Sequence, residues 1–132
     1  SGDFHLQVGL AMCYHALDQP QNALTEMEAH LNDSSRQAGY YDYFVLGCLY
    51  MQLQRDNEAL AAFDKQQSIY PLADNAFYLA KLSSNSTEQT QWLEKALQLA
   101  EMGQQMFDFY VTPFFKVYRY QLVEALEAIS EN

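Results

Sequence analysis

The sequence repeats itself at a spacing of 36 residues, and this period constrains the fold more than any other feature. Three residues of a first unit have counterparts in a second, pairing Tyr14, Ala23 and Met27 with Tyr50, Ala59 and Phe63. Apolar residues around both sets recur at steps of three and four, the period of an amphipathic helix. Helix pairs repeating at about this spacing are typical of α-solenoids, in which each hairpin buries a face against its neighbours. The chain is therefore expected to be a stack of helical hairpins.

Breaks in the periodicity divide the chain into three helix pairs and one final helix. The expected pairs cover residues 4–37, 40–73 and 73–101, and the final capping helix covers about 112–130. Polar residues stand at the predicted starts of the second helices, as N-caps do, at Asp18, Asp56 and Ser86. Thr112 and Pro113 have the pattern that opens a last helix. We expect a single domain over residues 1–132.

The second unit resembles a tetratricopeptide repeat. Its sequence fits the family pattern of aromatic, Leu-Gly, aromatic, Ala, Phe and Pro at Tyr43, Leu46, Gly47, Tyr50, Ala59, Phe63 and Pro71. Gly47 and Ala59 are small where the two helices of a hairpin cross closely, and Phe63 fills the gap between hairpins. The resemblance covers about residues 4–101, although the first unit has Met27 in place of Phe and the third lacks the Leu-Gly pair.

The resemblance implies an all-α fold: an α-solenoid of three antiparallel helix pairs in a right-handed superhelix, closed by a C-terminal capping helix. A weaker resemblance, in layout only, is to the tetratricopeptide chaperones of type III secretion translocators. Three hairpins with a closing helix in an acidic chain are common to both, but no diagnostic motif supports this second resemblance.

The charge balance excludes some classes of partner. Seventeen acidic residues against seven Lys and Arg give a formal net charge of -10. Nucleic acids and anionic membrane surfaces both need a basic face, so neither is an expected partner. Residues 1–35 contain five acidic residues and no Lys or Arg. That end would attract basic partners, unless it is simply a solvated acidic face that aids solubility.

The two cysteines, Cys13 and Cys48, both lie inside apolar runs. We expect them to be reduced, buried thiols, as in a cytoplasmic protein. The longest apolar stretch, Phe44 to Met51, is too short to span a bilayer, and no signal peptide is visible.

Catalytic and metal-binding patterns are missing from the sequence. His5, His15 and His30 have no Ser or Cys at a spacing typical of a nucleophile and its base, and a metal site would need further ligands. Glu26 and Glu28 point to different faces of a helix, so they cannot work as an acid and base pair. The chain is predicted to have no enzymatic activity and to bind no cofactor.

The resemblance also implies a binding surface, because the first helix of each hairpin lines the concave face of such arrays. By register, the groove residues are Val8, Met12, His15, Tyr41, Phe44, Cys48, Met51, Tyr78 and Lys81. The family's clamp for C-terminal carboxylates uses Lys and Asn at places where this chain has apolar residues, so that ligand is not expected. An apolar, aromatic, Met-containing groove favours hydrophobic segments. The alternative is that the chain's own last helix covers the groove.

Seven aromatic side chains lie between Phe107 and Tyr120, where the array ends. We expect a structural role, in which Phe107, Phe109 and Tyr110 anchor the connection. The lid over the third hairpin would then be formed by Phe114, Val117 and Tyr118. Phe115 and Tyr120 are the aromatic residues most expected to remain available to a partner.

Two functions are compatible with these patterns. The first is a non-enzymatic adaptor that binds a peptide or partner subunit, with a homodimer possible and a secretion-type chaperone for hydrophobic cargo as one variant. The second is a regulatory or assembly segment of a larger protein, which a start directly in periodic sequence would suit.

Overall fold

The computed structural model describes residues 2–35, 37–106 and 115–131, and every regular element in these ranges is an α-helix. In chain order the helices are α1 Gly2–Ala16, α2 Pro20–Asn32, α3 Asp42–Gln52, α4 Asp56–Ile69, α5 Ala73–Lys81, α6 Ser86–Glu101 and α8 Arg119–Ser130. None of these helices is both long enough and apolar enough to cross a membrane.

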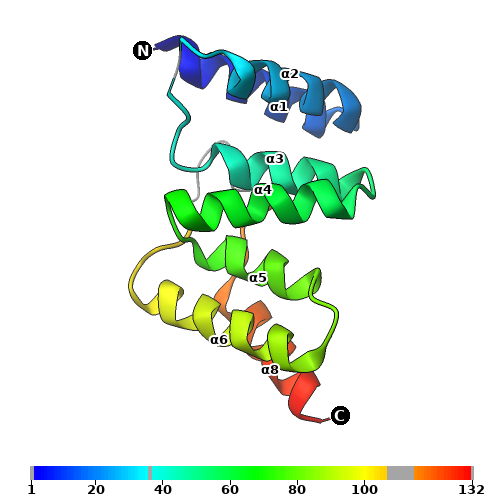
Figure 1. Ribbon diagram of the computed structural model, residues 1–132, viewed down its shortest axis with the longest axis vertical. Helices are drawn as coiled ribbons and strands as arrows, with labels where there is room; N and C mark the ends of the chain where they lie inside the picture. The colour runs from blue at the N-terminus through cyan, green and yellow to red at the C-terminus, as the bar shows by residue number, and fades with distance from the viewer. Residues whose placement is uncertain (1, 36, 107–114, 132) are drawn as a thin grey trace.

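The first six helices form three hairpins that stack along the long axis of the molecule (Figure 1). Each hairpin joins consecutive helices, α1 with α2, α3 with α4 and α5 with α6, and α2 packs on α3 as α4 packs on α5. The first hairpin lies at one end of the stack, and α8 packs against α6 at the other (Figure 1). The expected all-α solenoid of stacked helix pairs is confirmed.

The 36-residue period is visible in the backbone of the turns. Asp18 and Gln54, which are 36 positions apart, both have a left-handed backbone, with φ of 59° and 60°. In each turn the following N–H reaches back to the preceding helix, from Gln19 to the Tyr14 carbonyl at 2.8 Å and from Arg55 to the Tyr50 carbonyl at 2.9 Å. These bonds satisfy carbonyls that the helix end leaves without partners.

The helix caps lie one residue away from the predicted positions. The N-cap residues are Gln19, Arg55 and Asn85, where Asp18, Asp56 and Ser86 were expected. Asp18 belongs instead to the left-handed turn, and Asp56 and Ser86 are the first helical residues. Only Asn85 accepts a side-chain cap bond among these three, from the Glu88 N–H at 2.8 Å.

Close packing between α3 and α4 explains the glycine of the second hairpin. A Cβ placed on Gly47 would lie 2.5 Å from a ring carbon of Phe63, a distance that real side chains do not tolerate. Phe63 and Ala59 are both fully buried. The expectation that small residues allow a close helix crossing here is confirmed, and the neighbour that requires Gly47 is the Phe63 ring.

A buried glutamine also holds the second hairpin together. Gln66 accepts the Phe44 N–H at 3.0 Å and donates to the carbonyls of Tyr40 and Tyr70. Gln66 therefore ties the start of α3 to the end of α4. Polar groups at full burial are stable only when bonded in this way.

Some apolar residues that recur at helical spacing are exposed. On α4, Leu60 and Ile69 are 37% and 43% exposed, and their place in the core is taken by Ala62 and Gln66. The prediction of two buried thiols is confirmed for Cys48 and wrong for Cys13, which is exposed.

The final helix is shorter than the periodicity suggested. Residues 116–118 are not helical, and α8 begins at Arg119, so a continuous helix from residue 112 is wrong. Thr112 and Pro113 lie outside the described residues, as do Phe107, Phe109, Tyr110 and Phe114. Of the remaining lid residues, Val117 is buried whereas Tyr118 is 45% exposed.

Candidate functional site

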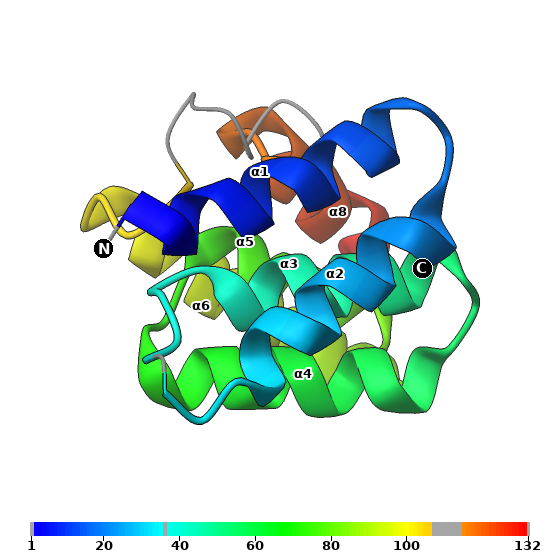
Figure 2. The same cartoon turned by 90° about the horizontal axis from the view of Figure 1, so that it is seen from above.

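One aromatic residue of the C-terminal segment, Phe115, contacts the first helix of all three hairpins through its ring and its carbonyl. The centroid of the Phe115 ring lies 4.8 Å from that of the His15 ring of α1. It lies 6.4 Å from that of the Phe44 ring of α3, and these two rings meet edge to face. The Tyr78 hydroxyl of α5 donates to the Phe115 carbonyl at 3.0 Å. Figure 2 places the segment that follows residue 114 on the α1 side of the stack, away from α4. We call His15, Phe44, Tyr78 and Phe115 together the Phe115 site.

A buried carboxylate anchors this segment to α5. Asp74, which is fully buried, accepts the Met106 N–H and the Val117 N–H, each at 2.7 Å. These donors precede and follow residues 107–114, so a single side chain holds both ends. Burial raises the pKa of Asp74, and the two N–H donors and the charge of Lys116 oppose that rise because they favour the ionised carboxylate.

Backbone bonds extend the anchor towards the end of α6. The Ala73 N–H donates to the Gln104 carbonyl at 2.8 Å, and the Gln104 side chain donates to the Pro71 carbonyl at 3.0 Å. Lys116 closes the arrangement by donating to the Met106 carbonyl. The chain on both sides of residues 107–114 is therefore bonded along the start of α5.

Most of the nine predicted groove residues are brought together, but many are inaccessible. Val8, Met12, Phe44 and Cys48 are buried at 4% exposure or less, in the same cluster as Phe115. The partly buried residues are His15, Tyr41, Met51 and Tyr78, and the last three pack against that cluster. Lys81 stands apart and is exposed, with its ammonium 5.1 Å from the centre of the Phe77 ring. Binding of a partner by these residues stays a prediction.

Phe115 was expected among the rings most available to a partner, and this expectation is wrong. It is 4% exposed, and its surroundings are apolar. Tyr120, the other candidate, is 62% exposed and stacks on Tyr118. The two residues differ because Phe115 reaches back to the hairpins, whereas Tyr120 lies in the first turn of α8 on its solvent side.

Burial keeps the ionisable groups of the site neutral. It lowers the pKa of His15, although a hydrogen bond with Gln52 and the charge of Asp18 partly oppose this. It raises the pKa of the Cys48 thiol well above its ordinary value. A neutral imidazole beside Phe115 and an unionised thiol suit hydrophobic packing, and the unionised thiol of Cys48 is a poor nucleophile at neutral pH.

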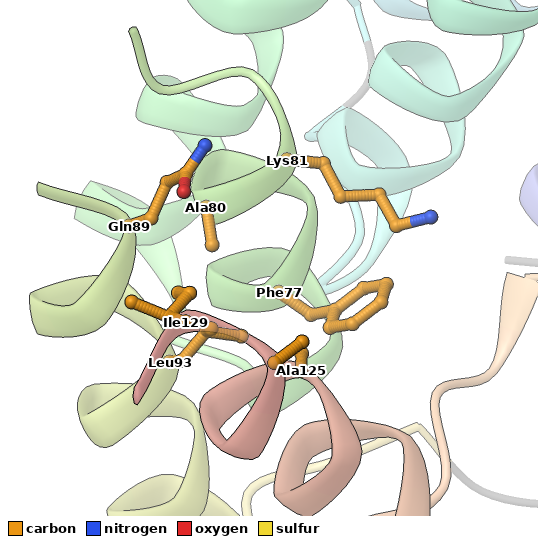
Figure 3. A pocket seen from close by; sticks show the side chains of 8 residues that line it. Phe77, Ala80, Lys81, Gln89, Leu93, Ala125 and Ile129 are labelled. Atoms are coloured by element: carbon orange, nitrogen blue, oxygen red, sulfur yellow. The ribbon is translucent and has the colours of Figure 1, made fainter. Parts of the chain in front are cut away.

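A hollow lies where α8 packs on the third hairpin (Figure 3). It measures about 250 Å³ and is lined by Phe77, Ala80, Lys81, Gln89, Leu93, Ala125, Ala128 and Ile129. Figure 3 shows Lys81 and Gln89 above the apolar floor formed by Phe77, Leu93 and Ala125. No sequence pattern indicated this hollow, because it forms only where three separate helices meet.

Within the ranges that the structure describes, no group of three or more His, Cys, Asp or Glu side chains lies close enough together to hold a metal ion. The buried side chains of His30 and Asp42 are in contact at 2.8 Å, and this contact links α2 to α3. Asp42 also accepts the Gly39 N–H at 2.8 Å. Because these bonds tie the first hairpin to the second, the pair has a structural part in the stack.

A sequence profile described as a tetratricopeptide repeat matches residues 43–71. This range covers α3 from its second residue and all of α4, and it includes the close approach of Gly47 to Phe63. Residues 43–71 of this chain form a tetratricopeptide repeat. Tetratricopeptide repeats are protein–protein interaction modules. No curated protein and no solved structure matches the chain, and the resemblance to secretion chaperones has no support from these comparisons.

The tetratricopeptide pattern predicted the scaffold residues better than the residues at the Phe115 site. Gly47, Ala59 and Phe63 follow from the family pattern, but Asp74 and the placement of Phe115 do not. The only signal for them was the density of aromatic residues after the third hairpin. Density alone does not say which ring turns back onto the hairpins.

Proposed function

We propose that this tetratricopeptide repeat protein is a non-enzymatic scaffold that binds a hydrophobic segment of a protein partner on the face formed by α1, α3 and α5. In the free chain the Phe115 ring occupies the centre of this face. A partner segment with an aromatic side chain would compete with Phe115 for the same place.

The observation that supports this proposal most is the set of contacts that Phe115 makes. A ring from outside the hairpins lies against His15 and Phe44, while its own carbonyl is bonded by Tyr78. Side chain and backbone are thus both recognised, in the way that a bound peptide is recognised: apolar packing of an anchor residue and a hydrogen bond to the main chain. Residues 116–118, which follow, are not helical.

Three partly buried residues around this place would extend the contact to a partner. Tyr41 and Met51 come from the two ends of α3, and His15 from the last turn of α1. Their flexible or aromatic side chains adapt to apolar ligands. The acidic balance of the whole chain, with a net charge of -10, favours a partner segment with basic residues beside the aromatic anchor.

The test compares three forms of the full chain as bait for partners from the native cell. Phe115→Ala should capture more of a specific partner than the wild-type chain, because the competing ring is gone. Val117→Ala is the matched control, since Val117 is equally buried in the same segment but packs against the cluster of α5, α6 and α8. Equal capture by all three forms would refute the proposed site. Capture that Phe115→Ala loses would show that Phe115 is itself a partner contact.

A second candidate function is a regulatory or assembly segment of a larger protein. The observation that favours it is the exposed apolar surface of the first hairpin, where Leu6 and Leu17 are 71% and 66% exposed. A neighbouring domain would bury such a surface. The two functions differ in which face is used, so Phe115→Ala would leave the second one unchanged.

A further inference from the structure

Helix α1 has apolar residues on two opposite faces. One face packs into the core through Val8, Ala11 and Met12, which are exposed by 4% or less. The opposite face consists of exposed residues at positions i, i+4, i+7 and i+11, namely Leu6, Leu10, Cys13 and Leu17. At 3.6 residues per turn these four residues form one line along the helix. We call this line the N-terminal stripe.

The N-terminal stripe lies at the open end of the stack. Among the described helices, the first hairpin has a neighbouring hairpin on one side only, since α2 packs on α3 (Figure 1). Leu6, Leu10 and Leu17 are 71%, 44% and 66% exposed, so no described residue covers them. Single exposed leucines are ordinary, but a contiguous apolar line along a whole helix is typical of an interaction surface.

The surroundings of the stripe are acidic. Residues 1–35 contain five acidic residues and no Lys or Arg. Glu26 of α2 lies beside α1, where the Gln7 side chain donates to it at 3.5 Å, and Asp18 is exposed next to Leu17. A second copy of this chain would bring the same acidic surface against itself, which costs free energy. A partner with basic flanks would be attracted instead.

We propose that the N-terminal stripe is a docking surface for an amphipathic helix whose apolar face is flanked by Lys or Arg. The leucines of the stripe form ridges into which the apolar side chains of a second helix pack. The basic flanks pair with acids beside the stripe, Asp18 and Glu26, which orients the partner and speeds its approach. This surface faces away from the Phe115 site, because α1 uses its opposite face there, so the two proposals can fail separately.

The protein contains its own reporter for this surface. Cys13 is an exposed member of the stripe, whereas Cys48 is fully buried and burial raises the pKa of its thiol. A thiol reagent such as iodoacetamide will therefore modify Cys13 first. A helix bound over the stripe should protect Cys13 from this reaction.

The probe is a synthetic amphipathic helix of about 18 residues, or five turns, with a leucine stripe and lysine flanks. Two control peptides are used. The first has the same composition in scrambled order, and the second has the same leucine stripe with glutamate in place of the lysine flanks. We expect only the lysine-flanked helix to slow alkylation of Cys13, in a saturable manner and less at high salt. Leu10→Gln should weaken its binding about tenfold or more, since burying one leucine contributes that much. Leu60→Gln, at an exposed leucine of α4, should leave binding unchanged.

Three results would overturn the proposal. The first is that the lysine-flanked helix leaves Cys13 alkylation unchanged, or slows it no more than the scrambled peptide does. The second is equal protection by the glutamate-flanked peptide, which would contradict the basic flanks. The third is a concentration-dependent dimer of the wild-type chain that Leu10→Gln abolishes, because the occupant would then be a second copy.

Discussion

The two ends of the stack differ in how far the apolar residues of the end hairpin are covered. At the C-terminal end, α8 covers the third hairpin, and Leu122 is 1% exposed in a cluster with Leu93 and Leu99 of α6. At the N-terminal end, Leu6 is 71% exposed on α1. A helical repeat buries its apolar faces only against neighbours, so an end hairpin needs a cap or a partner. The chain provides the cap at the C-terminal end, whereas no described residue covers Leu6 at the other end.

The C-terminal segment also does more than cover the end. On either side of residues 107–114, Met106 and Val117 donate their N–H groups to Asp74 of α5, and Phe115 reaches as far as α1. The N-terminal hairpin is therefore connected to the C-terminal segment through the Phe115 ring. The C-terminal segment thus contributes to packing along the whole stack, whereas the first hairpin packs on α3 through α2 and meets the C-terminal segment through His15.

The largest predicted loss of stability is at a fully buried residue of the second hairpin, and the losses at the two ends are compared with it. Phe63→Ala in the second hairpin should lower the free energy of unfolding by about 3 to 5 kcal/mol, since it leaves a large cavity. Urea denaturation measures this loss. The control is Leu60→Ala on the exposed side of the same helix, and a loss for Phe63→Ala no larger than for this control would contradict the packing against Gly47.

At the capped end, Leu122→Ala should cost about 2 to 5 kcal/mol, because Leu122 is the leucine of α8 that enters the core. Thermal or urea denaturation provides the measurement. A loss much below 1 kcal/mol would mean that α8 does not stabilise the third hairpin in solution, and the contrast between the two ends would disappear.

Within the segment that joins the ends, Tyr78→Phe removes the hydrogen bond to the Phe115 carbonyl and keeps the ring. We expect a loss of about 0.5 to 1.5 kcal/mol at neutral pH. Burial raises the pKa of Tyr78 above its ordinary value of 10.0, so above that pH the unfolded chain loses this proton while the folded chain keeps it. Stability should therefore fall as pH rises above about 10, and less steeply in Tyr78→Phe. An equal slope in both proteins would contradict a buried, bonded hydroxyl.

The smallest predicted change in the free energy of unfolding is at the N-terminal end of the stack. Leu10→Gln should change the free energy of unfolding by no more than about 0.5 kcal/mol, because the side chain is exposed. Circular dichroism and urea denaturation of the isolated chain provide the measurement. A loss comparable to that of Leu122→Ala would mean that the stripe is already covered in the free protein.

The fold was largely predictable from sequence, and its candidate site was not. The period of 36, the helix types and the Gly47 contact follow from local patterns, because helical spacing is a property of neighbouring residues. The faces of α1 were harder to assign. Leu6, Leu10, Cys13 and Leu17 have the same spacing as a buried stripe, and only the position of α2 and α3 decides that Val8 and Met12 lie inside.

By itself, the sequence determined the repeat, the helical hairpins and the acidic, cation-free first 35 residues. These features depend on composition and on spacing along one helix. Only the tertiary structure decided that Phe115 lies against three helices, that Asp74 binds both ends of one segment, and that the N-terminal stripe faces solvent. Each of these depends on which surfaces meet across the stack. Contacts between residues far apart in the chain produce no periodic pattern in a single sequence, so they could not be predicted from it.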